Sequence, residues 1–141
     1  MPKPKLHITI VSQEKQLEST EADSLTLPTV EGEITVLPGH IPLLSRLQTG
    51  ELHYTNENQS HSFVISTGFV DVGPDSIITV LVDTAVAARE ISLEKAQAAV
   101  RAAHEAMAQT VNQEELVMIE ASLKRALLEV KVAEKTKHAQ I

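Results

Sequence analysis

Cysteine is absent from this sequence, and aromatic residues account for only 2% of it. The lack of cysteine excludes a disulfide framework and a thiolate metal site. Because aromatic side chains are so few, the core must be built from Val, Ile, Leu and Ala. No apolar run reaches the roughly 18 residues that a membrane-spanning helix requires. The N-terminal stretch MPKPKLHITIV also has no apolar segment typical of a signal peptide, so neither feature is expected.

Positive charge is also scarce, because the formal net charge is −7. Nucleic-acid binding depends on clustered Lys and Arg side chains, so nucleic acid is not expected as the main partner. The 6 histidines never occur in the HxH, HxxxH or HExxH spacings of metal sites, and no glycine-rich phosphate loop is present. The sequence therefore predicts no metal ion and no bound cofactor.

Glycine, proline and alanine are divided unevenly along the chain. All 5 glycines and all 6 prolines lie at or before Pro74, whereas 14 of the 15 alanines lie at or after Ala85. Residues 1–86 carry a net charge of −7, and residues 87–141 carry a net charge of 0. These differences predict two domains, 1–86 and 87–141, with a boundary near residues 84–90.

The first of these domains has the pattern of short β-strands. Its segments alternate apolar and polar residues, as in LHITIV, or are rich in β-branched residues, as in SIITVLV. Turn signals such as NENQS and GPD separate them. Eight or more strands in about 85 residues favour a small antiparallel β-sandwich or a flattened barrel. The clearest strand segments are 6–11, 23–28, 33–37, 51–55, 61–66, 69–72 and 76–82.

The second domain has apolar residues at alternating steps of three and four, which is typical of amphipathic helices. We predict a first helix at 93–109, with Ser92 as its N-cap, and a second helix at 113–137. Glu115 lies three residues after Asn112, which predicts a capping box at the second helix start. The short link makes the two helices antiparallel. The predicted fold class is therefore α+β, a β-sandwich followed by a helical hairpin.

Alanine lines much of the predicted seam of the first helix, including Ala96 and Ala103. Because alanine buries far less apolar area than leucine, we expect a marginally stable hairpin that is able to dissociate and re-form. A permanently docked hairpin is the alternative, and the residues alone leave both possibilities open.

The stretch VEGEITVLPGHIPLL combines acidic residues, glycines, prolines and a histidine. Glu31 and Glu33 form either a solvated acidic loop or an acidic edge for a partner. His40 could act with one of these carboxylates as a catalytic pair, but no nucleophile accompanies it. We therefore favour a tight turn in which the imidazole bonds to backbone groups. Basic side chains of the second helix form either a solvated face or a binding stripe.

The stretch EGEITVLPGHIPLLSRLQTGEL resembles the epsilon-subunit family of F-type ATP synthases, which is called delta in mitochondria. The segments EADSLTLP, STGFVDV and VLVDTA are similar to further motifs of that family. The resemblance covers essentially the whole chain, and it implies the same sandwich and helix–turn–helix that the residue patterns predict.

The resemblance also implies a function. Members of this family are non-catalytic subunits that bind the gamma subunit and rest on the polar loops of the c-ring. They form the foot of the rotor and help couple ion flow to ATP synthesis. Their C-terminal helices can extend toward the alpha and beta subunits and restrain ATP hydrolysis. The implied location is the cytoplasmic face of a bacterial plasma membrane, and an ATP-sensing module of the same complex is the alternative.

Individual residues match family positions with assigned roles. Glu31, Glu33 and His40 match positions near the c-ring loops, which implies a partner interface there. The basic second helix fits a contact with acidic surfaces of the catalytic head when the helices extend. The charges expected to make that contact are Lys124, Arg125 and Lys131.

Some family members bind ATP through the motif I-D-x-x-R-A at the start of the first helix, together with further arginines. This sequence has ISLEKA there. The family's ATP-binding residues are replaced at Ser92, Lys95, Ala102 and Glu129, and the Glu129 carboxylate would repel a triphosphate. No useful ATP affinity is expected.

Thr35 and Thr67 stand where the family has glycine. A β-branched residue is strained where the backbone has positive φ. If these two positions required that conformation, the turns around them would be strained.

Overall fold

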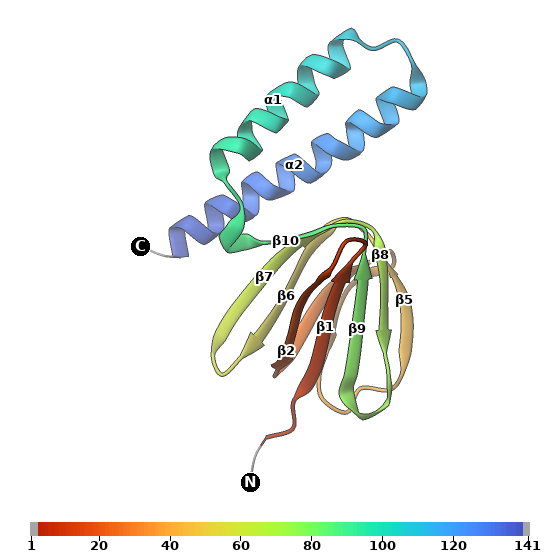
Figure 1. Ribbon diagram of the computed structural model, residues 1–141, viewed down its shortest axis with the longest axis vertical. Coiled ribbons are helices and arrows are strands. Elements are labelled where there is room, and N and C mark those ends of the chain that lie inside the picture. The colour runs from red at the N-terminus through yellow and green to blue at the C-terminus, as the bar shows by residue number, and fades with distance from the viewer. Residues whose placement is uncertain (1–2, 140–141) are drawn as a thin grey trace. The chain divides into compact units, whose positions relative to one another are not determined.

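The structure is a computed structural model that describes residues 3–139 (Figure 1). The chain forms two compact units, and the boundary along the chain falls between Val86 and Ala87. The described strands are β1 (Leu6–Ser12), β2 (Gln16–Ala22), β3 (Ser24–Thr29), β4 (Gly32–Val36), β5 (Leu43–Leu47), β6 (Gly50–Asn56), β7 (Gln59–Ile65), β8 (Gly68–Val72), β9 (Ile77–Val82) and β10 (Ala85–Ala87). The short 3-10 helices η1 (Pro74–Ser76) and η2 (Ala88–Glu90) precede the helices α1 (Leu93–Gln109) and α2 (Gln113–Ala139). The predicted β-sandwich followed by two helices is confirmed.

The strands form one continuous, curled sheet. Hydrogen-bonded neighbours follow the order β10-β7-β6-β3-β5-β8-β9-β1-β2, and β4 pairs with β3. In Figure 1 the sheet folds over, so that two layers of strands face each other. Most pairs are antiparallel, as predicted, but β1 runs parallel to β9, with Ile8 opposite Ile78.

Three strands, β2, β5 and the three-residue β10, lie outside the predicted segments. The sequence of β2, QLESTEA, has no apolar alternation, yet β2 pairs with β1 from Gln16 to Ala22. The sequence of β5, LLSRL, follows directly after the turn-forming PGHIP, and Leu43 to Leu47 pair with β8. For β2 and β5 the neighbouring strand, rather than local pattern, sets the conformation.

The core between the two layers is aliphatic, as the composition predicts. Leu6, Ile8 and Ile10 point inward from β1, and each has at most 1% of its surface exposed. Burying one such side chain contributes about 1.5–3 kcal/mol. The largest fully buried side chains all belong to this unit, and they are Leu6, Ile8, Ile10, Leu25, Leu27, Leu47, Leu52, Ile65, Ile78, Val36, Val64 and Val70.

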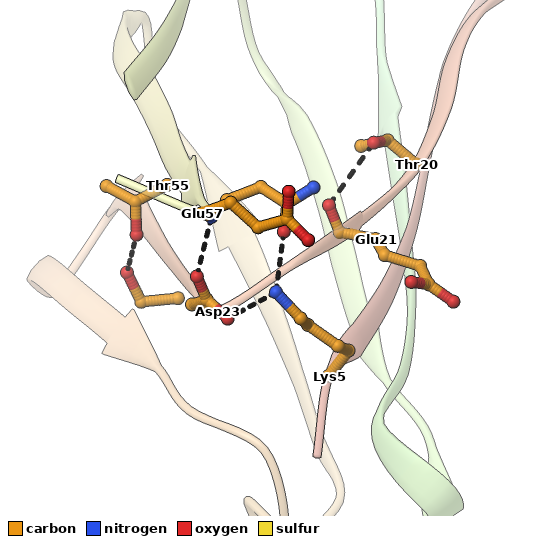
Figure 2. Close-up of polar contacts among 8 residues, drawn as sticks. Lys5, Thr20, Glu21, Asp23, Thr55 and Glu57 are labelled. Carbon is orange, nitrogen blue, oxygen red and sulfur yellow. Dashed lines mark hydrogen bonds and ion pairs between the residues drawn. The ribbon is translucent and has the colours of Figure 1, made fainter. Parts of the chain in front are cut away.

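Asp23 organises the end of the sandwich at which β3 begins. Its carboxylate accepts hydrogen bonds from Lys5 Nζ at 2.7 Å and from the Glu57 backbone N–H at 2.9 Å (Figure 2). Lys5 also donates to Asn56 Oδ1 at 2.7 Å. These bonds fix the β6–β7 turn, in which Glu57 and Asn58 have φ of 51° and 68°. The Lys5 ammonium, followed by the Glu57 N–H, holds the pKa of the Asp23 carboxyl below its ordinary value.

Neither Thr35 nor Thr67 is among the described residues with positive φ, so the strain considered for these positions is not present. Each threonine instead makes a hydrogen bond that glycine cannot make. The hydroxyls of Thr35 and Thr26 lie 3.0 Å apart across neighbouring strands. The Thr67 hydroxyl donates to Asp83 Oδ2 at 3.1 Å.

The helical unit contains α1 and α2. The bounds of α1 match the prediction, and Ser92 Oγ caps it by accepting from the Lys95 N–H at 3.3 Å. Its buried residues, Ala96 and Ala103, lie on the predicted seam. Val132 is a buried residue of α2, only 1% exposed. Within the described part of the chain, neither helix is long and apolar enough to cross a membrane.

The start of α2 differs from the predicted capping box. Asn112 Oδ1 accepts from the Glu114 N–H at 2.8 Å and so caps the helix. Glu115, however, accepts from the Thr110 hydroxyl at 2.9 Å, and Thr110 Oγ1 accepts from the Asn112 N–H at 3.4 Å. Thr110 therefore stands between the two members of the expected box, because its hydroxyl can donate and accept at once.

Candidate partner interfaces

The acidic turn joins β3 to β4. Gly32 has φ of +124°, which favours glycine, and Glu31 and Glu33 lie exposed on either side of it. The Thr29 hydroxyl closes the turn, because it accepts from the Glu31 N–H at 3.2 Å and donates to the Gly32 carbonyl. The turn therefore presents two carboxylates on a fixed backbone.

His40 lies in the loop between β4 and β5. The loop is tied to the β8–β9 turn, because the Gly39 N–H donates to Ser76 Oγ at 2.8 Å. The His40 imidazole Nδ1 lies 2.6 Å from the Ile41 carbonyl oxygen, and its backbone N–H donates to the Leu37 carbonyl at 3.0 Å. These backbone bonds match the tight turn that we favoured over a catalytic pair.

Glu31 and His40 lie at opposite ends of β4 and do not form one cluster. The 5 residues of β4 separate the acidic turn from the His40 loop. At about 3.3 Å per strand residue, this distance is on the order of 15 Å. The three residues grouped by sequence therefore belong to two surfaces, and the geometry offers no acid–base pair between Glu31 and His40.

A third surface, which sequence reasoning missed, is the outer face of β5, β8 and β9. Leu44, Phe69, Ile77 and Leu81 are 72%, 49%, 54% and 50% exposed, respectively. The strand register places Phe69 between Arg46 and Leu81 on the same face. A signal was present, since SIITVLV is apolar at positions of both parities, whereas a strand with one solvated face alternates.

A groove of about 420 Å³ lies beside this face, at the end that holds Arg46, Phe69 and Leu81. Val11, Phe69 and Leu81 supply apolar lining, and Arg46 and Asp83 supply one charge of each sign. Asp83 is fixed there, because Gln13 and Thr67 donate to its carboxylate. The groove thus combines exposed apolar area with oriented polar groups, the composition of a protein-binding surface.

The three basic residues proposed from the α2 sequence differ in their surroundings. Lys124 and Lys131 are exposed and lie seven residues apart, on the same face of the helix. Arg125 is half-buried and forms an ion pair with Glu129, with Nε and Oε1 3.5 Å apart. The two lysines are therefore better placed to meet a partner than Arg125.

Three of the four positions at which the family's ATP-binding residues are replaced have structural roles of their own. Ser92 caps α1, and Lys95 donates its backbone N–H to that cap. Glu129 forms an ion pair with Arg125. Ala102 lies exposed on α1 and supplies no charge.

Comparisons with known proteins identify the family. The model of the ATP synthase delta/epsilon chain β-sandwich domain matches residues 5–88. The ATP synthase epsilon chain of Dehalococcoides mccartyi is 41% identical over 139 residues, which cover 97% of this chain and 99% of that protein. The epsilon chain of Herpetosiphon aurantiacus is 38% identical over 135 residues, with 96% and 98% covered. The sequence resemblance is thereby confirmed.

Solved structures agree with these relatives. A chain in the Euglena gracilis mitochondrial ATP synthase, in a structure of OSCP, F1 and c-ring, aligns with a TM-score of 0.68 and 25% identity. The alignment covers 99% of this chain and 83% of that one. A chain of the Tetrahymena thermophila central stalk and c-ring shares the fold, with a TM-score of 0.60 at 16% identity over 94% and 99% of the two chains. This chain belongs to the delta/epsilon family of ATP synthase subunits.

Proposed function

We propose that this chain is the central-stalk subunit that joins the gamma subunit to the c-ring of a proton-translocating ATP synthase. As a member of the family it is a non-catalytic part of that complex, held peripherally at the membrane through its partners. The observation that carries the proposal is the outer face of β5, β8 and β9, where four large apolar side chains lie exposed. Exposed apolar side chains gathered on one face mark a protein interface, and gamma is the partner that we assign to it.

The gamma assignment is tested by Phe69→Ser and Leu81→Ser, because both side chains are about half exposed and contribute little to the core. Each change is expected to weaken gamma binding about tenfold or more, since apolar anchors dominate interface energies. The measurement is titration of purified gamma with each variant. Leu127→Ser, which removes an equally exposed leucine of α2, is the matched control. Equal affinity of all variants would contradict the assignment.

The acidic turn is proposed to contact the polar loops of the c-ring through Glu31 and Glu33. Its exposed carboxylates stand on a backbone fixed by Thr29, which suits a contact that must transmit force. His40 lies at the other end of β4, beside the exposed Ile41, so we assign it to the gamma side of the subunit. Replacing both glutamates with lysine is expected to reduce ATP-driven proton pumping more than ATP hydrolysis. Equal loss of both activities would count against a coupling role.

Regulation of hydrolysis is proposed to reside in the helical unit. In the extended state, Lys124 and Lys131 would meet acidic surfaces of the alpha and beta subunits, and Arg125 would do so only after leaving Glu129. Deletion of residues 88–141 is expected to raise ATP hydrolysis by the assembled enzyme. Lys124→Glu with Lys131→Glu should have the same direction of effect, and Lys95→Glu on α1 is the control. Unchanged hydrolysis in the deletion would remove the inhibitory role and leave the rotor role intact.

The proposed location is the cytoplasmic face of a bacterial plasma membrane, because the Dehalococcoides mccartyi and Herpetosiphon aurantiacus relatives are bacterial epsilon chains. ATP sensing is not proposed, since Arg125 is paired with Glu129 and Ser92 is engaged as a cap. Calorimetry with ATP is expected to give no binding in the micromolar range.

A further inference from the structure

The link between α1 and α2 forms a tip that the hairpin itself leaves uncovered. Val111 is 100% exposed, and Val117 and Met118 are 66% and 72% exposed. The link is nonetheless held by hydrogen bonds, because the Thr110 hydroxyl accepts from the Asn112 N–H and donates to the Glu115 carboxylate. A hydrogen-bonded tip with three exposed apolar side chains has the composition of a docking surface.

A hollow of about 550 Å³ lies at this tip, between the end of α1 and the start of α2. Ala106, Met118 and Ile119 give it an apolar floor, and the carboxylate of Glu115 stands at its edge. The lining residues are Ala106, Gln109, Thr110, Glu115, Met118 and Ile119.

Charge around the tip has a single sign. Residues 102–123 contain four glutamates, Glu105, Glu114, Glu115 and Glu120, and neither lysine nor arginine. Glu115 accepts one hydrogen bond from Thr110, and an ionised carboxylate has sites for several more. A cation that approaches the hollow would therefore meet an acceptor that is already oriented.

We propose that the hairpin tip is a docking site for a lysine- or arginine-bearing segment of a neighbouring subunit in the ATP synthase. Such a side chain has an aliphatic stem that fits the floor formed by Ala106, Met118 and Ile119, and a charged end that reaches Glu115. The local excess of glutamate attracts the same segment and repels acidic ones. This inference rests on the proposed function, because the partner belongs to the assembled complex.

The chain has no cysteine, so a single introduced thiol reports on one position only. Val111→Cys is the probe, because that side chain is fully exposed and its replacement does not affect packing. Maleimide labelling of this thiol is measured in the isolated chain and in purified complex. We expect labelling in the complex to be at least tenfold slower. Equal rates in the two states would overturn the proposal.

The charge requirement is tested in the same background. Glu115→Gln keeps the shape of the side chain and an oxygen that can accept from Thr110, but removes the charge. This change is expected to raise the labelling rate of Cys at position 111 in the complex severalfold. An increase in salt concentration should have the same effect, because salt screens the charge attraction. Glu94→Gln, at the far end of α1, is the control and should leave the protection unchanged. If labelling at position 111 stays equally slow in the complex after Glu115→Gln and at increased salt, the partner is not cationic. Assembly is measured beforehand by co-purification. Failure to assemble counts against the proposed function, whereas faster labelling in an assembled complex reports on the tip alone.

Discussion

The sandwich and the hairpin of this chain are stabilised in different ways. The sandwich buries a dozen leucine, isoleucine and valine side chains completely, whereas the buried residues of α1 are Ala96 and Ala103. Burial of an alanine contributes much less than burial of a leucine, at about 25 cal/mol per Å². Polar contacts also differ. Asp23 and Asp83 each bind groups distant in sequence, whereas the hydrogen bonds of Thr110 and Asn112 and the Arg125–Glu129 ion pair join residues at most 5 positions apart. These differences indicate a sandwich of higher local stability than the helical unit, which suits the fixed rotor contact and the movable regulator that we propose.

The largest expected effect comes from truncating the sandwich core. Leu25→Ala removes a side chain that is 0% exposed and should lower the free energy of unfolding by about 2–5 kcal/mol. Leu123→Ala, at a half-buried position of α2, should cost clearly less. Denaturant unfolding, with hydrogen exchange as the probe of each unit, measures the loss of unfolding free energy in the two variants. Equal losses would contradict the proposed difference between the two regions.

The next largest effect is expected at Gly68, where β8 begins. A Cβ at this position would lie 2.0 Å from the Leu81 carbonyl oxygen and 2.7 Å from Val82 Cα, both of which are backbone atoms. Gly68→Ala should therefore destabilise the sandwich by about 1–3 kcal/mol. Gly73→Ala is the control, since its Cβ would come only within 3.2 Å of Ile77 O. Thermal unfolding of the two variants checks the ranking.

A smaller and local effect is expected for Ser92→Ala, which removes the N-cap of α1. The lost hydrogen bond to the Lys95 N–H should destabilise the helix by about 1 kcal/mol. Amide exchange should become faster in the first turns of α1 and stay unchanged in the sandwich. Ser92→Asp retains a capping oxygen and should behave like the parent chain. Faster exchange throughout the sandwich would show that the two regions are coupled more tightly than we infer.

The smallest expected effect is on acid stability and concerns Asp23. Lys5 and the Glu57 N–H lower the pKa of its carboxyl. Between this lowered pKa and the ordinary pKa of aspartate, the folded state therefore binds fewer protons than the unfolded state. The resulting stabilisation is complete above the ordinary pKa of aspartate, near pH 4, and is lost as the pH falls through the lowered pKa. Asp23→Asn should therefore show a shallower decline of Tm below about pH 4, and Asp71→Asn, at an exposed position of β8, serves as the control.

Local pattern was sufficient for the elements whose residues repeat. The 93–109 helix and its Ser92 cap were predicted to the residue, because the apolar spacing and the cap lie within a few positions of one another. Strand β2 was missed because its sequence is polar. Strand β5 was missed because it directly follows PGHIP, whose glycine and prolines are typical of a turn. The expected strain at Thr35 and Thr67 was absent, since φ at these positions is not positive.

The candidate interfaces were harder to predict than the fold. Motif matching grouped Glu31, Glu33 and His40, which are close in sequence, but β4 carries the chain from one end of the sandwich to the other between them. The outer apolar face shows the opposite case. Leu44, Phe69 and Leu81 are distant in sequence and become neighbours only through the β5–β8–β9 register.

By itself, the sequence determined the division into a glycine- and proline-punctuated β-unit and an alanine-rich helical unit. Those properties depend on backbone preferences and on side chains a few residues apart. Tertiary structure alone decided that β1 runs parallel to β9, that Lys5 and Glu57 meet at Asp23, and which apolar side chains remain exposed. Each of these follows from strand pairing between distant segments, and pairing depends on the whole sheet closing around one core.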